Sequence, residues 1–321
     1  YERWIAGVRL RWDDLMKRLT DWLVYLVVRL AICFVHAISL ESCHAIARVL
    51  AWVACDVVRL RQGVVEDNLR QAFPDLTDGD RRGLARQMWE HLFLMGCEIA
   101  HAPRKVHETN WRRYFYFHGK REMVACLLDP RPTVFVSGHF GNFELSSYMM
   151  GLFGFPTYAI ARPLDNPYLD RYVNQFRSTH GQFILPKDGS AAQVDAVLRS
   201  GGVIALLADQ HAGRKGCWVD FFGRPASCHK AVALFTLVSG APLLVAYGRR
   251  IGGPLQFELG VAKIADPRIP SEDQSNVTRL TQWYNRALEE IIIASPEQYW
   301  WVHRRWKGTP PKKGKRPEPS H

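Results

Sequence analysis

The sequence is poor in acidic residues, and this imbalance limits the kinds of partner that it can bind. Its 321 residues contain 31 Asp and Glu against 42 Lys and Arg, which gives a formal net charge of +11 at pH 7. Such an excess predicts acidic partners, namely anionic lipid, nucleic acid or an acidic carrier protein. The sequence contains no nucleic-acid-binding motif, so nucleic acid is not expected as a partner.

The cysteine patterns of disulfide-framed secreted proteins are also missing. The seven cysteines form no C-x-x-C pair, their number is odd, and most lie in apolar stretches. This usage is typical of reduced core thiols in a protein that folds in the cytoplasm. Internal repeats are absent, and no short apolar core with a small-residue cleavage site indicates a signal peptide.

One stretch is long and apolar enough to enter a membrane. Residues 19–40 read LTDWLVYLVVRLAICFVHAISL, with Arg29 and His36 interrupting the apolar run. At about 100° per residue, Arg18, Tyr25, Arg29 and His36 share one narrow polar stripe, and the other faces are apolar. The helix is therefore predicted to lie in the membrane interface, or to span it with the stripe packed on protein. A buried core helix of a soluble domain is the alternative.

The rest of the chain alternates between helices and apolar strands. Residues 42–105 are predicted as helices, with a break at 73–80 where Thr77 or Asp78 can cap the helix that follows. Strands are predicted at 133–137, 157–161, 182–185, 203–208 and 241–247. Later helices are predicted at 142–153, 166–178, 190–199, 228–239 and 272–294. This order predicts an α/β fold, with a mostly parallel central sheet flanked by helices on both faces and an N-terminal membrane-associated helix.

The segment VFVSGHFGNFE (134–144) holds the strongest candidates for catalysis. A predicted strand ends at Ser137, a glycine turn carries His139, and a helix begins near Asn142 with Glu144 in its first turn. A neutral imidazole can take a proton from a hydroxyl near pH 7, and a carboxylate on its other nitrogen fixes the tautomer. Glu144 is placed to be that carboxylate. Alternatively, His139 is a turn histidine, and Glu144 complements the helix dipole or completes a capping box.

Polar residues at two further strand ends indicate a shared site. Asp209 and Gln210 follow one predicted strand and Arg162 follows another, where an open α/β sheet has its ligand crevice. Arg162 is suited to hold a phosphate or carboxylate. The plainer explanations are that Asp209 and Gln210 cap the next element, and that Arg162 is a surface residue before a proline turn. No metal is expected, because H-x4-E is not a usual zinc spacing and no second His or Cys cluster follows.

Two aromatic segments complete the set of motifs. In residues 219–235, Phe221 and Phe222 are expected in the core, and a helix is expected to begin near Ser227. The segment PEQYWWVHRRWK (296–307) concentrates Trp and Tyr beside basic residues. It is predicted to form a surface for the membrane interface or for anionic headgroups.

The ordered motifs SGHFGNFE, ARPLDNP, ADQ, FFGRPA and PEQYWWVHRRWK, after a membrane helix and EDNLRQAFPDL, resemble the lipid A late acyltransferase family. The resemblance spans residues 20–307. It implies transfer of a fatty acyl chain from a thioester donor, usually acyl carrier protein, to a hydroxyl of a lipid A-type glycolipid precursor. The implied location is the cytoplasmic face of the bacterial inner membrane, where lipopolysaccharide synthesis takes place.

By motif position, the catalytic dyad of that family falls on His139 and Glu144, and further polar site residues fall on Arg162 and Asp209. Gln210 and Asn142, beside these residues, are additional candidates for substrate binding. Backbone N–H groups of the turn at 140–143 are candidate donors to the oxyanion of the reaction. No metal or nucleotide cofactor is implied, and the acyl thioester is a co-substrate.

The implied partners are a membrane glycolipid acceptor, an acyl carrier protein or acyl-CoA donor, and an anionic membrane surface. The apolar helix predicts a membrane-anchoring segment at 1–45, a catalytic domain is predicted at 46–308, and the Pro- and Lys-rich composition predicts a basic disordered tail at 309–321. Residues 227–230 depart from a Thr- and Gly-rich turn of the family, which leaves the acceptor and the acyl chain length open. Another glycolipid, such as a mannosylated inositol lipid, is one alternative acceptor. A non-catalytic lipid-binding membrane protein is the alternative from a different class.

Overall fold

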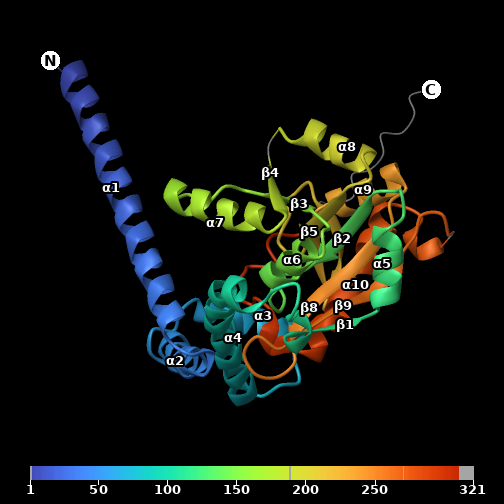
Figure 1. The fold of residues 1–321 in the computed structure, drawn as a ribbon, viewed down its shortest axis with the longest axis horizontal. Coiled ribbons are helices and arrows are strands. Elements are labelled where there is room, and N and C mark those ends of the chain that lie inside the picture. Colours follow the sequence, from blue (N-terminus) through green and yellow to red (C-terminus); the bar gives the residue numbers. More distant parts are fainter. Residues whose placement is uncertain (1, 188, 270, 311–321) are drawn as a thin grey trace, which may run out of the picture.

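A seven-stranded sheet forms the centre of the molecule (Figure 1). The computed structural model describes residues 2–187, 189–269 and 271–310, and of residues 2–13 it describes only the helical backbone. The strand order is β1-β9-β8-β2-β5-β3-β4, and the only antiparallel pair in this sheet of described residues is β8 with β9. The strands are β1 (Phe115–His118), β2 (Thr133–Ser137), β3 (Thr157–Ala161), β4 (Gln182–Pro186), β5 (Val203–Leu207), β8 (Leu243–Arg250) and β9 (Phe257–Ala265).

Helices cover both faces of this sheet. The helices that precede the first strand in the sequence are α1 (Glu2–Ala37), α2 (Leu40–Trp52), the π-helix η1 (Val53–Val57), α3 (Gln62–Ala72) and α4 (Asp78–Lys105). Those that follow it are α5 (Lys120–Leu127), α6 (Phe143–Leu152), α7 (Pro167–Thr179), α8 (Ala191–Arg199), α9 (Ala231–Ser239) and α10 (Val277–Ala294). Short 3-10 helices are η2 (Trp111–Arg113), η3 (Glu272–Gln274) and η4 (Pro296–Gln298). The mostly parallel sheet with helices on both faces confirms the predicted fold class.

The two covered faces explain why the central strands are continuous apolar runs. In β2, Val134 and Val136 belong to the core beneath α9 and α10, whereas Phe135 packs with residues of α5 and α6. In β5, Ile204 faces α8. Because side chains of a strand alternate between faces, both faces need apolar residues when both are covered. Because β2, β5 and β3 are parallel neighbours, their carboxyl ends lie side by side at one edge of the sheet.

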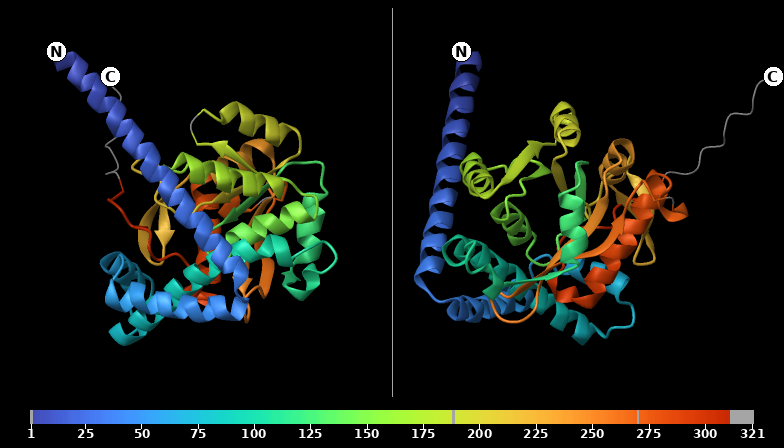
Figure 2. Two further views of the ribbon diagram at one scale, coloured as in Figure 1. Left: turned by 60° about the vertical axis from the view of Figure 1, so that its left-hand side comes forward. Right: turned by 45° about the vertical axis from the view of Figure 1, so that its right-hand side comes forward.

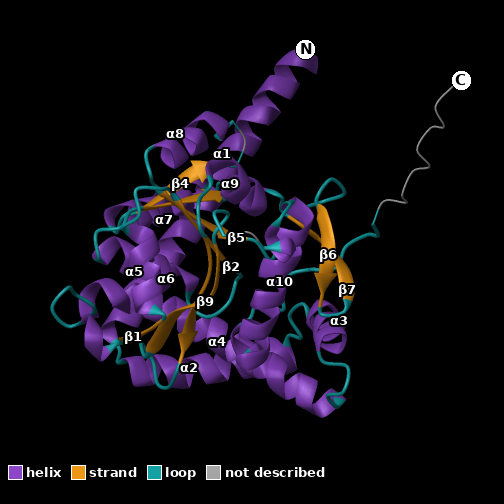
Figure 3. Ribbon diagram, turned by 90° about the vertical axis from the view of Figure 1, so that its right-hand side faces the viewer, coloured by secondary structure: helices purple, strands orange, loops and turns teal. Residues whose placement is uncertain are grey.

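The sequence prediction missed some strands and misplaced one helix start. A hairpin of β6 (Cys217–Phe221) and β7 (Arg224–Cys228) stands apart from the main sheet (Figure 3). Ser227 therefore lies in a strand, and the expected helix begins later, at Ala231. Phe221 is fully buried, as expected, and Thr77 caps α4 through a capping box with Asp80. All seven cysteines are free thiols, but the predicted core position holds only for Cys43, Cys217 and Cys228, and Cys33 is exposed.

The polar stripe of α1 faces the rest of the protein. Arg29 donates a hydrogen bond to the Tyr25 hydroxyl at 3.0 Å, and its guanidinium carbon lies 4.7 Å from the centre of the Tyr172 ring on α7. Further along, the His36 ring is 2.8 Å from the Ala100 carbonyl oxygen of α4, so this ring nitrogen donates. Figure 2 shows α1 running beside α7 and down to α2. Tyr25, Arg29 and His36 of the polar stripe are thus used in packing, whereas Arg18 is exposed.

The apolar faces of α1 point away from the protein. Residues 14–37 are long and apolar enough to cross a membrane by length and composition, and none of their most apolar window is buried in the rest of the chain. The exposed apolar side chains of this stretch include Trp22, Leu23, Leu26, Leu30 and Phe34. Among the alternatives that the sequence leaves open, a buried core helix is wrong. The predicted division at residues 45 and 308 stays a prediction, and residues 311–321 of the predicted tail lie outside the described part of the chain.

Candidate active site

A tight turn between β2 and α6 carries His139 at the carboxyl edge of the sheet. Gly141 has a left-handed φ of +57°, and a Cβ at this position would lie 1.8 Å from the Gly248 carbonyl oxygen of β8. Only glycine avoids this collision, because it has no Cβ. The Asn142 N–H donates to that same carbonyl oxygen at 2.9 Å. The turn is therefore held directly against the neighbouring strand.

The carboxylate that binds the His139 ring comes from β5. Asp209 Oδ1 lies 2.8 Å from His139 Nδ1, and Asp209 Oδ2 accepts a hydrogen bond from the His139 backbone N–H at 2.9 Å. The sheet register explains this pairing. Ser137 and Leu207 are register partners in parallel strands, and His139 and Asp209 each follow two residues later. Two strand ends that neighbour each other in the sheet thus bring the two side chains together.

The charges of this pair stabilise each other. Burial raises the pKa of Asp209, but the neighbouring imidazole, its two hydrogen bonds and Arg305 more than offset burial and hold the pKa well below its usual range. For His139, burial lowers the pKa, but the charge and hydrogen bond of Asp209, with a smaller effect of Glu144, raise it above its ordinary value. An ionised carboxylate only accepts hydrogen bonds, so Nδ1 of His139 carries a hydrogen and the neutral ring has its lone pair on Nε2.

This lone pair points to a polar and aromatic enclosure. The Gln210 side-chain nitrogen lies 3.2 Å from His139 Nε2 and also 3.2 Å from His303 Nε2. The rings of Phe143 and Trp300 lie with their centres 5.3 Å and 5.2 Å from that of His139. The lone pair of His139 is therefore available to a hydroxyl that displaces the Gln210 amide.

Glu144 has a different partner from the one predicted. Its carboxylate binds the Arg177 guanidinium of α7 in a two-pronged ion pair, with Arg177 Nε donating to Oε2 at 3.1 Å. The position in the first turn of α6 directs Glu144 towards α7, whereas Asp209 reaches His139 from the adjacent strand. The expectation that Glu144 bonds to the imidazole is thus wrong for this contact. Glu144 still lies close enough for its charge to contribute to the raised pKa of His139.

Arg162 lies at a neighbouring cavity of about 670 Å³. Its side chain is 80% exposed and donates a hydrogen bond to Asp165 at 3.3 Å. Arg171 and Arg177 also line the cavity. His139 is not among the described residues that line it, so the structure does not bring Arg162 to the imidazole. The Glu144–Arg177 pair connects the surroundings of His139 with this basic cavity.

Two further expectations about the turn are corrected by burial and hydrogen bonding. Asn142 is fully buried, its Oδ1 accepts from the Leu145 N–H at 3.2 Å, and its Nδ2 donates to Glu98 at 3.4 Å. This side chain caps α6 and is not free to bind a substrate. The Gly141 N–H donates to the Gln298 carbonyl oxygen at 2.8 Å, and the Asn142 N–H to β8. These two N–H groups are therefore not oxyanion donors in this arrangement.

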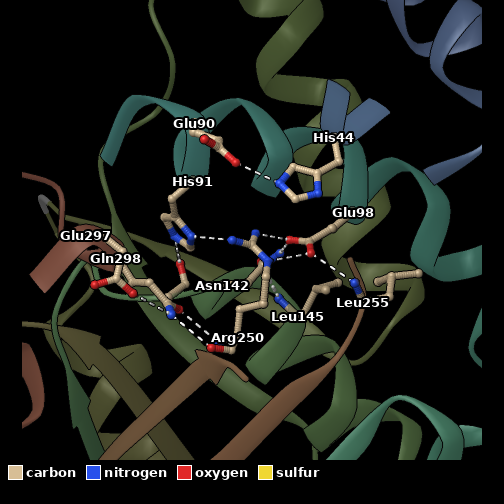
Figure 4. A network of polar contacts seen from close by, with 11 residues as sticks. His44, Glu90, His91, Glu98, Asn142, Leu145, Arg250, Leu255, Glu297 and Gln298 are labelled. Carbon is tan, nitrogen blue, oxygen red and sulfur yellow. Dashed lines mark hydrogen bonds and ion pairs between the residues drawn. The ribbon is translucent and has the colours of Figure 1, made fainter. Parts of the chain in front are cut away.

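Behind the turn lies a buried polar network that the sequence prediction missed (Figure 4). Arg250 donates from Nε to Glu98 at 2.8 Å and from Nη1 to His91 Nδ1 at 2.8 Å. A guanidinium only donates, so His91 accepts at Nδ1 and donates from Nε2 to the Gly141 carbonyl oxygen, 3.1 Å away. Burial, followed by the charge of Arg250, lowers the pKa of His91 to about 3, so the ring stays neutral. The network holds the turn at Gly141, whereas Asp209 holds it at His139.

The aromatic and basic segment at 296–307 belongs to the core and the site. Tyr299, Trp301 and Arg305 are buried, and the Trp300 N–H donates to the His139 carbonyl oxygen at 3.0 Å. Burial, and then the charge of Asp209, raise the pKa of Tyr299 well above its ordinary value. The predicted membrane or headgroup surface is therefore wrong for these residues. The dense Trp and Tyr residues of this segment indicate burial next to His139 rather than an exposed surface.

Within the described ranges, no group of three or more His, Cys, Asp or Glu side chains is placed to hold a metal ion. The site is an imidazole–carboxylate pair in which His139 Nε2 can accept one proton. It lies beside a cavity lined by arginines. Such a pair suits general-base activation of a hydroxyl.

Comparison with known proteins agrees with this chemistry. The family model described as bacterial lipid A biosynthesis acyltransferase matches residues 12–308. The chain is 25% identical over 267 residues to the lipid A biosynthesis lauroyltransferase of Escherichia coli K12, which covers 81% of this chain and 84% of that protein. It is 24% identical to the E. coli palmitoleoyltransferase, over 79% of this chain and 81% of that protein. A Haemophilus influenzae lipid A biosynthesis acyltransferase is 24% identical over 91% of both chains.

Proposed function

Because the chain belongs to the bacterial lipid A biosynthesis acyltransferase family, we propose that it transfers a fatty acyl chain from a thioester to a hydroxyl of a lipid A-type glycolipid precursor. The observation that carries the chemistry is the 2.8 Å contact between His139 Nδ1 and Asp209, which leaves Nε2 as the proton acceptor. Acyl carrier protein is the proposed donor, and the net charge of +11 suits an acidic carrier.

His139 acts as the general base in the proposed mechanism. Nε2 takes the proton of the acceptor hydroxyl while the hydroxyl oxygen attacks the thioester carbonyl carbon. The tetrahedral intermediate then collapses, the carbon–sulfur bond breaks, and the departing thiolate takes the proton back from the imidazolium. Asp209 holds the tautomer and stabilises the imidazolium that forms between the two steps. The base and the acid are thus the same nitrogen.

The neighbouring residues position the substrates in this proposal. The Gln210 side-chain nitrogen contacts His139 Nε2, so the incoming hydroxyl replaces this amide as the partner of Nε2. Arg162 and Arg171 line the basic cavity and are suited to an anionic part of the donor or acceptor. The Glu144–Arg177 pair joins this cavity to the base and keeps α6 and α7 in place.

The proposed location is the cytoplasmic face of the bacterial inner membrane. The exposed apolar faces of residues 14–37 support it, because their polar stripe is already packed on α4 and α7. With one side of α1 held by the catalytic body, the helix is proposed to enter the bilayer with its apolar faces only.

Mass spectrometry of membrane lipids tests the function directly. Cells that lack the protein should lose one acylated glycolipid, and the protein should restore it whereas the His139→Ala variant should not. The mass of the lost species identifies both the acceptor and the acyl chain. Restoration by His139→Ala would contradict the enzymatic proposal and favour a lipid-binding role.

The transfer is proposed to need no metal or nucleotide, since a base and a thioester suffice. We therefore expect the initial rate of acyl transfer to be unchanged after dialysis against EDTA. Acyl transfer is measured with purified protein in detergent. A known zinc enzyme, dialysed in the same way, serves as the positive control and should lose its activity. Loss of activity that added zinc restores would show instead that His139 is a metal ligand.

The pH dependence follows from the raised pKa of His139. The base works in its neutral form, so kcat/KM should rise with pH through that pKa, at a midpoint above the ordinary imidazole value of about 6.5. Asp209→Asn removes the main cause of the increase and leaves burial, which lowers the pKa, so the midpoint should move to lower pH. Glu144→Gln should move it in the same direction by less. A midpoint that neither change moves would exclude His139 as the titrating base.

A further inference from the structure

A second apolar surface lies next to α1, on α2 and the segment that follows it. At about 100° per residue, the face of α2 opposite its buried residues carries Ala45, Val49 and Trp52. Val49 is 61% exposed and Trp52 is 51% exposed. The surface continues beyond the helix through Val57, Val58 and Leu60, which are all exposed. We call this set, with the basic residues below, the α2–η1 surface.

Basic side chains lie between these apolar residues. Arg48, Arg59 and Arg61 are exposed, and no acidic group in the described part of the chain forms an ion pair with any of them. The acidic residue of the segment, Asp56, is already paired with Arg82 and Arg86 at 2.8 Å each. The charge of the α2–η1 surface is therefore positive and available to an anionic partner.

The surface also contains a shallow hollow of about 480 Å³, lined by Ala45, Arg48, Val49 and Trp52. Three of these lining residues are apolar and the fourth is Arg48. A lipid offers the matching arrangement, because its apolar chains lie directly beneath an anionic phosphate. A protein partner would have to place an apolar group in the hollow and an acidic group beside Arg48.

The position of the surface distinguishes a bilayer from other partners. Both α1 and α2 lie along the same side of the molecule, and α2 begins three residues after α1 ends (Figure 2). Both helices pack on α4, through His36 of α1 and His44 of α2, and their exposed apolar residues lie on the faces turned away from these contacts. A flat and partly anionic bilayer can contact both helices at once.

We infer that the α2–η1 surface is a second membrane-contact surface, which binds an anionic bilayer beside α1. The inference rests on the membrane location within the proposed function, but not on the acyl transfer itself. It adds a function for residues 45–61: they set the orientation of the catalytic body on the membrane, because one helix alone leaves the body free to rotate.

Vesicle flotation of the full chain tests this inference. One set of vesicles is phosphatidylcholine alone, and the other contains equal parts of phosphatidylcholine and phosphatidylglycerol. The double change Val49→Gln with Trp52→Gln should lower the partition coefficient roughly tenfold on both sets, because apolar burial does not depend on lipid charge. The control Val238→Gln removes a side chain that is 83% exposed on α9 and should change nothing.

The basic residues give a second, separate result. Replacing Arg48, Arg59 and Arg61 together with Gln should lower binding to the anionic vesicles roughly tenfold or more, and should leave binding to neutral vesicles unchanged. High salt should reproduce this loss in the unmodified chain. The control Arg199→Gln, at an 80% exposed arginine of α8, should bind like the unmodified chain.

Several outcomes would overturn the inference. Unchanged partition of the apolar double variant would show that α1 accounts for all binding. A variant that binds normally but changes from dimer to monomer in light scattering would show that a second copy covers the surface.

The circular dichroism spectrum and the acyl transfer rate of each variant in detergent micelles should match those of the unmodified chain, so a loss of binding is not a loss of folding. Failure of acyl transfer in every variant, the unmodified chain included, would contradict the proposed function and leave the flotation result intact.

Discussion

Replacing Asp209 with asparagine should lower turnover almost as much as replacing His139 with alanine. General-base catalysis contributes roughly 10²–10⁴-fold, and the base is effective only when Asp209 holds its tautomer and stabilises its charge. The double variant should be scarcely slower than His139→Ala alone, because Asp209 acts through the imidazole. Single-turnover rates at saturating donor measure this, since they separate chemistry from binding.

Glu144→Gln is the matched control for that experiment. It also removes one carboxylate near His139, but this carboxylate binds Arg177. Its effect should therefore multiply with that of His139→Ala, whereas the effect of Asp209→Asn should not. If the two patterns were reversed, Glu144 would be the working partner of the imidazole, and the contact between His139 and Asp209 would be structural. Circular dichroism should first show that each variant keeps its helices.

The largest loss of stability is expected from Glu98→Gln. Glu98 is fully buried and carries the charge that balances Arg250, so the variant leaves a buried guanidinium without a counter-charge. Breaking a buried ion pair in this way costs about 3–5 kcal/mol. For a domain of this size, Tm should fall by roughly 10 °C. Thermal unfolding in detergent, followed by circular dichroism, measures the change.

Two comparisons identify the cause of that loss. Asp195→Asn breaks an exposed pair with Arg199, and Tm should hardly change because solvent screens such pairs. The combined change Glu98→Leu with Arg250→Met removes both charges, so it should be less destabilising than Glu98→Gln alone. An equal or larger loss in the combined variant would show that hydrogen bonds to the turn, rather than the unpaired charge, determine the stability of this region.

The sequence allowed the central strands to be predicted because they are buried on both faces. Strands β2 and β3 have the predicted bounds, and β4 and β5 differ from the prediction by one residue at an end. A long apolar run between glycine or proline residues is a local signal, and local signals are readable without the fold. The strands β1 and β9 were missed because apolar and polar residues alternate in them, whereas β4, at the other edge of the sheet, was predicted from its apolar run.

Three of the predicted residues lie together in the structure, but their contacts were not predicted. His139, Asp209 and Gln210 were all named from the ends of apolar strands, and the structure brings them together. The partner of His139 was sought among its sequence neighbours, which favoured Glu144. The true partner depends on which strand lies beside β2 and in what register, and neither is visible in a local pattern. For the same reason Arg177 and the network of Glu98 and Arg250 escaped prediction.

The turn at His139 is completed only by a segment that is synthesised late, residues 298–303. The turn at His139 is held by the Gln298 carbonyl and the Trp300 N–H, and Asn68 of α3 binds the carbonyl oxygens of Trp301 and His303 at 2.7 Å and 2.6 Å. These residues are synthesised after α1, β2 and β5. A chain that has been synthesised only as far as Asp209 therefore contains both members of the His139–Asp209 pair, but not the segment that fixes the turn.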